Sequence, residues 1–181
     1  AMFARCYKLT SLDLRNFNTS NVTNMYGMFY GCNSLINLDL SNFDTKNVTM
    51  MNRMFLGCTS LTNLDLSNFN TSKVTDMEAM FSACSNLEKL NISNFDTSNV
   101  ISMGGTTGGW YGMFAGCYSL IELNLCSFDT SKVTDMSNMF YGTEKLKNIY
   151  VSSKWTTQNA NITDMFTASN ISSVTTGKCS N

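Results

Sequence analysis

The chain has 181 residues, a formal net charge of −1, and charged side chains at only 14% of its positions. Because it carries no basic stripe, nucleic acid and anionic membrane surfaces are poor candidates for partners. The sequence has no histidine and no Cys-x-x-Cys pair, so we expect neither a zinc site nor a cofactor. No apolar run reaches the roughly 18 residues that a membrane-spanning helix needs.

The chain repeats with a period of 26 residues, which is shown most clearly by Cys6, Cys32, Cys58 and Cys84. Cys117 follows after a seven-residue insertion, and Thr143 takes the next place in the column. A period of about 20–29 residues with a Leu-x-x-Leu-x-Leu core predicts a leucine-rich-repeat solenoid. We expect one domain of about six repeats over residues 1–168, with a truncated first repeat, and an irregular end over residues 169–181.

Each repeat is expected to begin with a strand, because apolar and polar residues alternate after the cysteine. Stacked repeats would join these strands into one parallel sheet, with neighbours about 4.8 Å apart. Five phenylalanines in one column are expected to turn inward as an aromatic spine: Phe17, Phe43, Phe69, Phe95 and Phe128. The last repeat departs from this pattern, since Trp155 comes one place late.

A turn with the sequence Asp/Asn-Thr-Ser follows each strand, and its Asx side chain is expected to bind the backbone two residues on. Val22, Met25, Phe29 and Cys32 then recur at a spacing that predicts one face of a short helix. Threonines such as Thr23 would cap these helices and the glycines before the cysteines would end them. The predicted fold class is therefore an α/β solenoid, a leucine-rich-repeat horseshoe or right-handed coil. It would have one parallel sheet and short helices on the opposite side.

Five of the seven cysteines share one column, and four of them follow a small residue, where a small apolar side chain packs well. We therefore favour a reduced, buried ladder over disulfide bonds between neighbouring repeats. Cys126 and Cys179 stand outside this column. Cys126 is expected on the exposed sheet, either as a reactive thiol or paired with the C-terminal tail.

The motif L-D-L-S-x-F-D-T-S-x-V-T-x-M-x-x-M-F-x-G-C, clearest at residues 64–84 and 38–58, resembles the 26-residue repeat of BspA-like leucine-rich-repeat proteins. The resemblance covers residues 2 to about 166. It implies a secreted bacterial surface protein, anchored to the cell wall or to lipid through parts outside this chain. It also implies adhesion to host or matrix proteins or to other microbes, and it offers no catalytic residue. The insertion, Thr143 and the polar end after Phe166 depart from the pattern.

Outward strand positions form polar columns that are candidates for ligand binding, since repeat proteins commonly bind partners on such extended faces. Their small amide and hydroxyl side chains favour a glycan or an extended peptide, although a plain solvated face fits equally well. The candidate residues on this expected concave ladder are Asn37, Asp39, Ser41, Asn63, Asp65, Ser67, Lys89, Asn91, Glu122, Asn124 and Tyr150.

Three aspartates in one column, Asp13, Asp39 and Asp65, would repel one another by roughly 1 kcal/mol per neighbour. Hydrogen bonds to flanking residues are the favoured compensation, and a weakly bound calcium ion is the alternative. The same spacing approximates the carboxyl separation of a retaining glycosidase. Nothing distinguishes an acid from a nucleophile here, so we do not expect an enzyme.

The insertion over residues 104–110 carries four glycines and ends with Trp110, which Tyr111 follows, and both are aromatic residues of a kind favoured at interfaces. It is either a binding loop or a tolerated insertion. The leading functional hypothesis is an extracellular or cell-surface module that binds a host or microbial protein or glycan. A structural spacer that displays another domain is the rival. We expect a monomer or weak end-to-end association.

Overall fold

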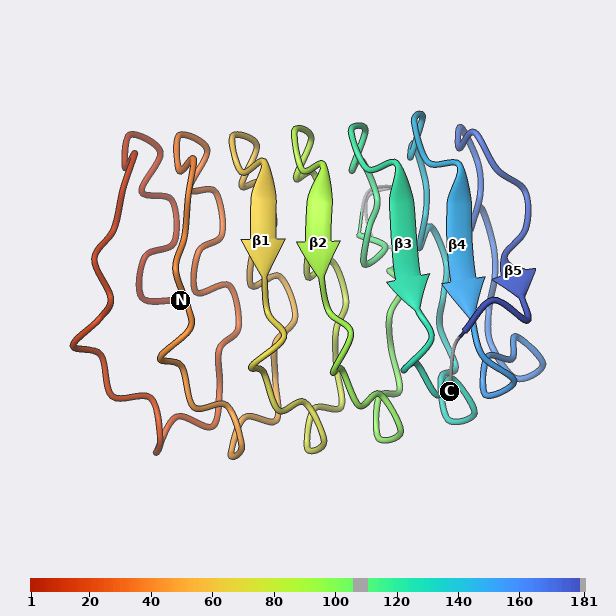
Figure 1. Cartoon of the computed structure of the whole chain (residues 1–181), viewed down its shortest axis with the longest axis horizontal. Helices are drawn as coiled ribbons and strands as arrows, with labels where there is room; N and C mark the ends of the chain where they lie inside the picture. The colour runs from red at the N-terminus through yellow and green to blue at the C-terminus, as the bar shows by residue number, and fades with distance from the viewer. Residues whose placement is uncertain (106–110, 180–181) are drawn as a thin grey trace.

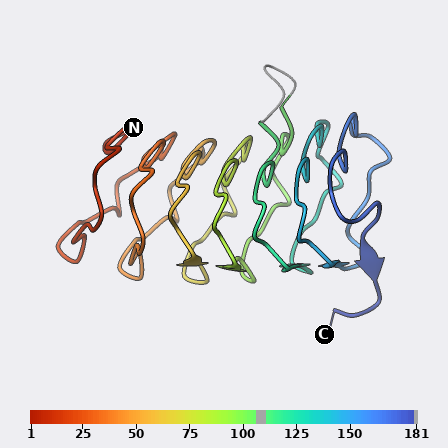
Figure 2. The same ribbon diagram turned by 90° about the horizontal axis from the view of Figure 1, so that it is seen from above.

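The computed structural model describes residues 1–105 and 111–179. The chain winds into coils that follow one another along a nearly straight axis (Figures 1 and 2). Each coil passes once along a strand side and returns on the opposite side, so equivalent residues of successive repeats lie next to each other. Isolated parallel bridges on the return side, from Asn24 and Met50 to Asp135 and Asn161, connect six coils in order.

The strands are short and form two separate parallel sheets rather than the single sheet expected. One sheet pairs β1 with β2, and the other has the order β3, β4, β5. Their bounds are Asn63–Asp65, Lys89–Asn91, Glu122–Leu125, Asn148–Val151 and Thr175–Thr176 for β1 to β5. The last of these lies in the C-terminal segment that was expected to be irregular.

The predicted helices are wrong: residues 1–105 and 111–179 contain no helix, so the fold is not an α/β solenoid with helices opposite the sheet. The segment expected to be helical is a run of tight turns. Met28 N donates to Met25 O at 3.2 Å, and Cys32 N donates to Phe29 O at 3.0 Å. These turns place an apolar residue inside at a spacing of three or four, as a helix would.

Hydrogen bonds between coils explain why turns replace the helix. Phe29 N donates to Met54 O and Gly31 N donates to Leu56 O, so alternate amides point along the stack. In a helix these amides would bond within their own segment. The turns also need left-handed residues, at Gly27 (φ 54°) and Gly31 (φ 71°) and at most of their counterparts in later coils. Consecutive helical residues keep a negative φ throughout.

The core contains two aromatic stacks. The expected spine is confirmed for Phe43, Phe69, Phe95 and Phe128, which are buried and stack in pairs with ring centroids 6.5 and 6.4 Å apart, whereas Phe17 is only half-buried. A second stack runs along the turn side with centroids 5.4 to 5.7 Å apart, from Phe3 through Phe29, Phe55, Phe81, Phe114 and Phe140 to Phe166. The sequence pattern placed Phe29 inside but did not predict this continuous stack.

The cysteine column is confirmed as a ladder of free thiols, of which Cys32, Cys58, Cys84 and Cys117 are buried and Cys6 is exposed. Each buried thiol donates to the carbonyl oxygen of a phenylalanine one coil earlier, as Cys58 does to Phe29 at 3.2 Å. The column therefore contributes polar contacts between coils as well as packing. Thr143 takes the same place and donates to Phe140 O at 2.8 Å.

Candidate functional site

The outward face of the two sheets carries most of the predicted ligand-binding residues. Parallel pairing sets Asn63 beside Lys89 and Asp65 beside Asn91 on β1 and β2. It also sets Asn124 beside Tyr150 on β3 and β4, with Glu122 beside Asn148. The predicted columns therefore exist as rows of neighbouring side chains on what we call the sheet face, the outward residues of β1 to β4. Asn37, Asp39 and Ser41 are exposed as well, in a coil with no assigned strand.

A shallow hollow of about 240 Å³ lies between β1 and β2. Its polar walls are the paired residues Asn63, Asp65, Lys89 and Asn91, and its floor is formed by Leu64 and Leu90. Leu90 is half-buried, whereas Leu64 is buried. The hollow therefore offers a small apolar surface between one carboxylate and one ammonium group. All four polar side chains in it belong to the predicted set.

Local hydrogen bonds stabilise the column of three aspartates. Ser41 N donates to Asp39 at 3.0 Å, and Ser67 N donates to Asp65 at 2.9 Å. These backbone hydrogen bonds lower the pKa of both carboxyl groups. Arg15 donates to Asp13 with its side chain at 2.7 Å, and this contact lowers the pKa of Asp13 to about 2. The carboxylates are thus compensated by the residue two places on in the chain.

The same arrangement leaves the calcium alternative without support. In the parts of the chain that the structure describes, no group of three or more acidic, cysteine or histidine side chains is placed to hold a metal ion. A calcium site takes at least about six oxygen ligands. The Asp/Asn-Thr-Ser turns form Asx turns as predicted, since Ser98 N donates to Asp96 and Ser131 N donates to Asp129.

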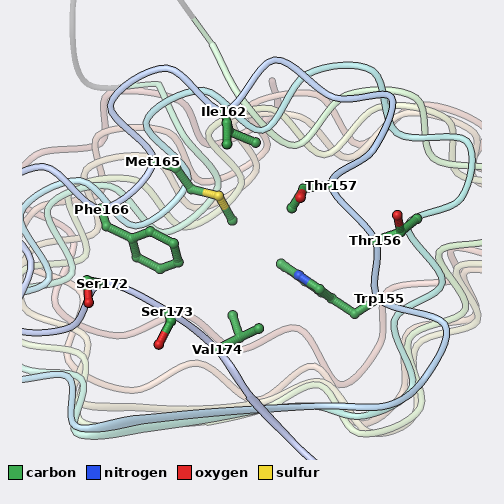
Figure 3. A pocket seen from close by; sticks show the side chains of 9 residues that line it. All are labelled: Trp155, Thr156, Thr157, Ile162, Met165, Phe166, Ser172, Ser173 and Val174. Carbon is green, nitrogen blue, oxygen red and sulfur yellow. The ribbon is translucent and has the colours of Figure 1, made fainter.

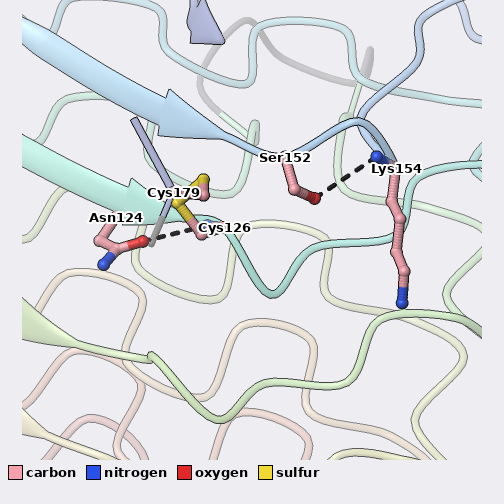
Figure 4. Close-up of a disulfide and its surroundings, with 5 residues drawn as sticks. All are labelled: Asn124, Cys126, Ser152, Lys154 and Cys179. Atoms are coloured by element: carbon pink, nitrogen blue, oxygen red, sulfur yellow. Dashed lines mark hydrogen bonds between the residues drawn. A yellow bond between two sulfur atoms is a disulfide. The ribbon is translucent and has the colours of Figure 1, made fainter. Parts of the chain in front are cut away.

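The C-terminal tail covers part of the sheet face, a contact that the sequence left open. Cys126 forms a disulfide with Cys179, with the Cα atoms 5.6 Å apart (Figure 4). Lys178 lies over the ring of Tyr150 at 5.6 Å. Tyr150 in turn donates to Glu122 at 3.0 Å, and this hydrogen bond raises the pKa of the phenol. The predicted residues Glu122 and Tyr150 therefore bind each other, and Lys178 of the tail lies over Tyr150 while Glu122 stays exposed.

The first two residues of the insertion, Gly104 and Gly105, form hydrogen bonds to the next coil. Gly104 N donates to Asp135 O and Gly105 N to Ser137 O, and the bond of Gly105 is the one that Gly27 makes to Asn52 in a regular coil. A side chain on Gly104 would collide with Ser137 N, which explains the glycine. Regular pairing resumes at Met113, whose backbone N donates to Met103 O. Trp110, the aromatic residue proposed for binding, lies outside the described residues.

Tyr111 anchors the C-terminal end of the insertion to earlier coils. Its ring lies 4.9 Å from the guanidinium carbon of Arg53. Arg53 forms an ion pair with Glu78 at 2.8 Å, and that contact raises the pKa of the guanidinium. Gly105 lies against Tyr111, because a side chain on this glycine would meet the tyrosine Cβ. Tyr111 is half-buried in this cluster, so at least part of its surface serves the fold.

A cavity of about 410 Å³ opens at the C-terminal end of the stack. Figure 3 shows it inside the last coil, between Trp155 and Phe166, with Ser173 and Val174 of the tail crossing beside it. Phe166 ends the second aromatic stack, 5.4 Å from Phe140. The cavity is thus the open end of the core, and the tail partly closes it.

Stacked coils joined by parallel pairing, with the same side chains inside each coil, define a repeat protein. The chain belongs to the DUF285 family, described as "Mycoplasma protein of unknown function", whose model matches residues 1–110 and again residues 58–176. Overlapping matches to one model are what a repeated sequence produces. No curated protein and no solved structure is significantly similar to the chain. Within the described residues, no helix has the length and apolar character needed to cross a bilayer.

Proposed function

We propose that the chain is a bacterial cell-surface repeat module that binds a host matrix protein, glycoprotein or other microbial ligand through the sheet face. The observation that carries this proposal is the open hollow between β1 and β2, where Asn63, Asp65, Lys89 and Asn91 lie side by side. Donors and acceptors alternate there around an apolar floor, which suits a glycan or an extended peptide. We propose no catalytic role and no cofactor for this face.

Two further observations support an extracellular or cell-surface location. The Cys126–Cys179 disulfide belongs to the kind of bond that persists in oxidising compartments and is rare in the cytosol. The repeat motif at residues 64–84 resembles that of BspA-like leucine-rich-repeat surface proteins, for which adhesion is the expected role. Binding along a row of similar sites would be multivalent, with overall affinity rising with the number of repeats.

The alternative is a spacer that displays another domain of a larger surface protein. It is favoured by Lys178 of the tail, which lies over Tyr150, and by the Cys126–Cys179 disulfide, because a partly covered face offers less room for a ligand. A spacer needs only a rigid stack, and the hydrogen bonds between coils supply that. The two functions differ in one respect that is easily measured, which is whether the isolated chain binds anything.

The test is saturable binding of this chain to immobilised matrix proteins, mucins and glycans. A variant with Asp65→Ala and Lys89→Ala removes both charges from the hollow, and a variant with Glu144→Ala and Lys145→Ala is the matched control on exposed residues elsewhere. A third variant lacks residues 106–110. Loss of binding only in the hollow variant supports the proposal. Loss only with the deletion moves the site to the insertion, and no binding by the folded wild type favours the spacer.

A further inference from the structure

At one position of the repeat, the residue in the coil of β3 differs from the residue in the earlier coils, and a hollow lies beside it. In earlier coils an asparagine precedes the spine phenylalanine and binds the coil before it. Asn42 Nδ2 donates to Leu14 O at 2.9 Å and to Phe17 O at 3.1 Å, and Asn68 makes the equivalent bonds to Leu40 O and Phe43 O. Ser127 takes this place in the coil of β3, and its buried hydroxyl has no hydrogen-bond partner.

The shorter side chain leaves a hollow of about 440 Å³ between the turns that follow β2 and β3. Ser127 is too short to fill the space that an asparagine amide takes in the earlier coils. The walls are the carboxylates of Asp96 and Asp129, with Asn94 and Ser98 beside them. This volume lies within the roughly 300–1,000 Å³ that is usual for small-ligand pockets.

Lys154 adds the opposite charge. It lines the same hollow from the next coil, and Figure 4 shows its side chain extended toward the segment that follows β2. Its ammonium group contributes to the lowered pKa of both Asp96 and Asp129, after the larger effect of hydrogen bonds from Ser98 and Ser131. No ion pair within 4.0 Å joins Lys154 to either carboxylate among the described residues. Its hydrogen-bonding capacity is therefore open to a ligand.

We propose that this hollow binds one neutral sugar residue. Each carboxylate has one oxygen engaged by its own Asx turn, as Ser131 N and Oγ both bind Asp129 Oδ1, which leaves the second oxygen as an acceptor. Sugar hydroxyl groups donate to such oxygens and accept from an ammonium group, so a pair of adjacent hydroxyls matches the lining. Two carboxylates disfavour an anionic ligand, and the ammonium group of Lys154 offsets one of the two negative charges that would attract a cation. The site is separate from the sheet face and does not depend on the function proposed for it.

The test is a titration of the ¹⁵N-labelled chain with methyl glycosides of neutral hexoses and N-acetylhexosamines, followed by amide chemical shifts. Saturable shifts centred on Asn94, Ser98 and Ser127 are expected for at least one probe. Ser127→Asn restores the residue of the column, and we expect it to fill the hollow and weaken binding at least tenfold while the fold stays intact. Asp129→Asn keeps the Asx turn, as Asn18 and Asn70 do in their coils, and should weaken binding about tenfold.

Matched controls establish whether the shifts arise from this hollow. Asp44→Asn makes the same change in a coil that retains its asparagine at position 42, and should leave the shifts unchanged. Asp65→Ala with Lys89→Ala alters the sheet face and should also leave them unchanged, whatever that face binds. The proposal is overturned if no neutral sugar gives saturable shifts. Equal binding by Ser127→Asn, or a response to methylammonium or calcium in place of sugars, overturns it too.

Discussion

The hydroxyl of Thr45 binds the backbone of Asn70 in both directions: it donates to the carbonyl oxygen at 3.0 Å and accepts from the amide nitrogen at 2.8 Å. The same two bonds join Thr19 to Asp44, Thr97 to Asp129, and Thr130 to Thr156. The four threonines whose hydroxyl groups make these bonds, Thr19, Thr45, Thr97 and Thr130, are all buried. In each of these four coils one threonine side chain thus satisfies a donor and an acceptor of the next coil.

Replacing Thr45 with valine keeps the shape of the side chain but removes both hydrogen bonds. The amide and carbonyl of Asn70 then lose their partner in a partly buried position, so we expect a loss of about 3 kcal/mol in the free energy of unfolding. Urea denaturation measures this loss. Thr49→Val is the control, because the hydroxyl of Thr49 is exposed and the expected change is under about 0.5 kcal/mol. Equal effects at the two positions would refute the role given to the threonine ladder.

Gly112 and Gly57 differ in what an added methyl group meets. A Cβ on Gly112 would collide with the carbonyl group of Asn138, so Gly112→Ala should cost about 3 kcal/mol of stability. Gly57 has a φ of 74° but no atom closer than 3.7 Å to the added Cβ, and Ala83 takes the same place in the next coil with a φ of 56°. Gly57→Ala should therefore cost only about 1 kcal/mol. Thermal denaturation of both variants shows which one loses more stability. A larger loss for Gly57→Ala than for Gly112→Ala would contradict the packing described for the two glycines.

The tail disulfide is expected to form spontaneously under oxidising conditions. Intact mass before and after reduction should differ by two hydrogens for the pair Cys126 and Cys179, with the ladder thiols unchanged. Cys179→Ser should remove about 2–4 kcal/mol of stability, since the bond closes a loop of 53 residues. Faster amide exchange over β4 and β5 is expected to accompany that loss. Unchanged exchange there would show that the tail is held without the disulfide.

Because of the buried thiols of the cysteine column, the free energy of unfolding is expected to fall as the pH rises in the alkaline range. Burial raises the pKa of Cys117 to about 12 and that of Cys84 well above its ordinary value. Below about pH 8.5 these thiols are protonated in both folded and unfolded chains, so their share of the stability is complete. That share is lost as the pH rises toward 12, because the unfolded chain releases its protons first.

Cys117→Thr supplies the matched variant, since Thr143 shows that threonine fits this column. Urea denaturation at several pH values between about 8 and 11 should show a shallower decline for the variant than for the wild type. Parallel curves for the two proteins would mean that the thiol of Cys117 does not contribute to the decline.

Added calcium should leave the melting temperature unchanged. Asp39 and Asp65 already accept backbone hydrogen bonds, Asp13 is paired with Arg15, and the described residues hold no group of three acidic side chains placed to bind a metal ion. A ligand that binds only the folded state raises the melting temperature, so differential scanning calorimetry with excess calcium is a sensitive check. Magnesium at the same ionic strength is the control. A rise with calcium alone would revive the cation site.

Burial and local turns could be predicted from the sequence wherever they depend on the chemistry of a single side chain and its place in the repeat. Phe69, Cys84 and the leucines of the strands are apolar at a fixed period, so their burial follows from the repeat alone. The Asx turns at Asp96 and Asp129 were predicted for the same reason, because the side chain binds backbone two residues on. The helix was predicted wrongly because the spacing of the apolar residues from Val22 to Cys32 suits tandem turns as well as a helix.

The sequence by itself determined the repeat, the inward residues, the reduced cysteine ladder and the rows of the sheet face. All of these depend on hydrophobicity and period, which are local properties. Only the tertiary structure decided between helix and turns, since the outcome depends on amides such as Phe29 N finding partners in the next coil. It also decided the pairing of Cys126 with Cys179 and the hollow at Ser127, because both arise from groups far apart in the chain.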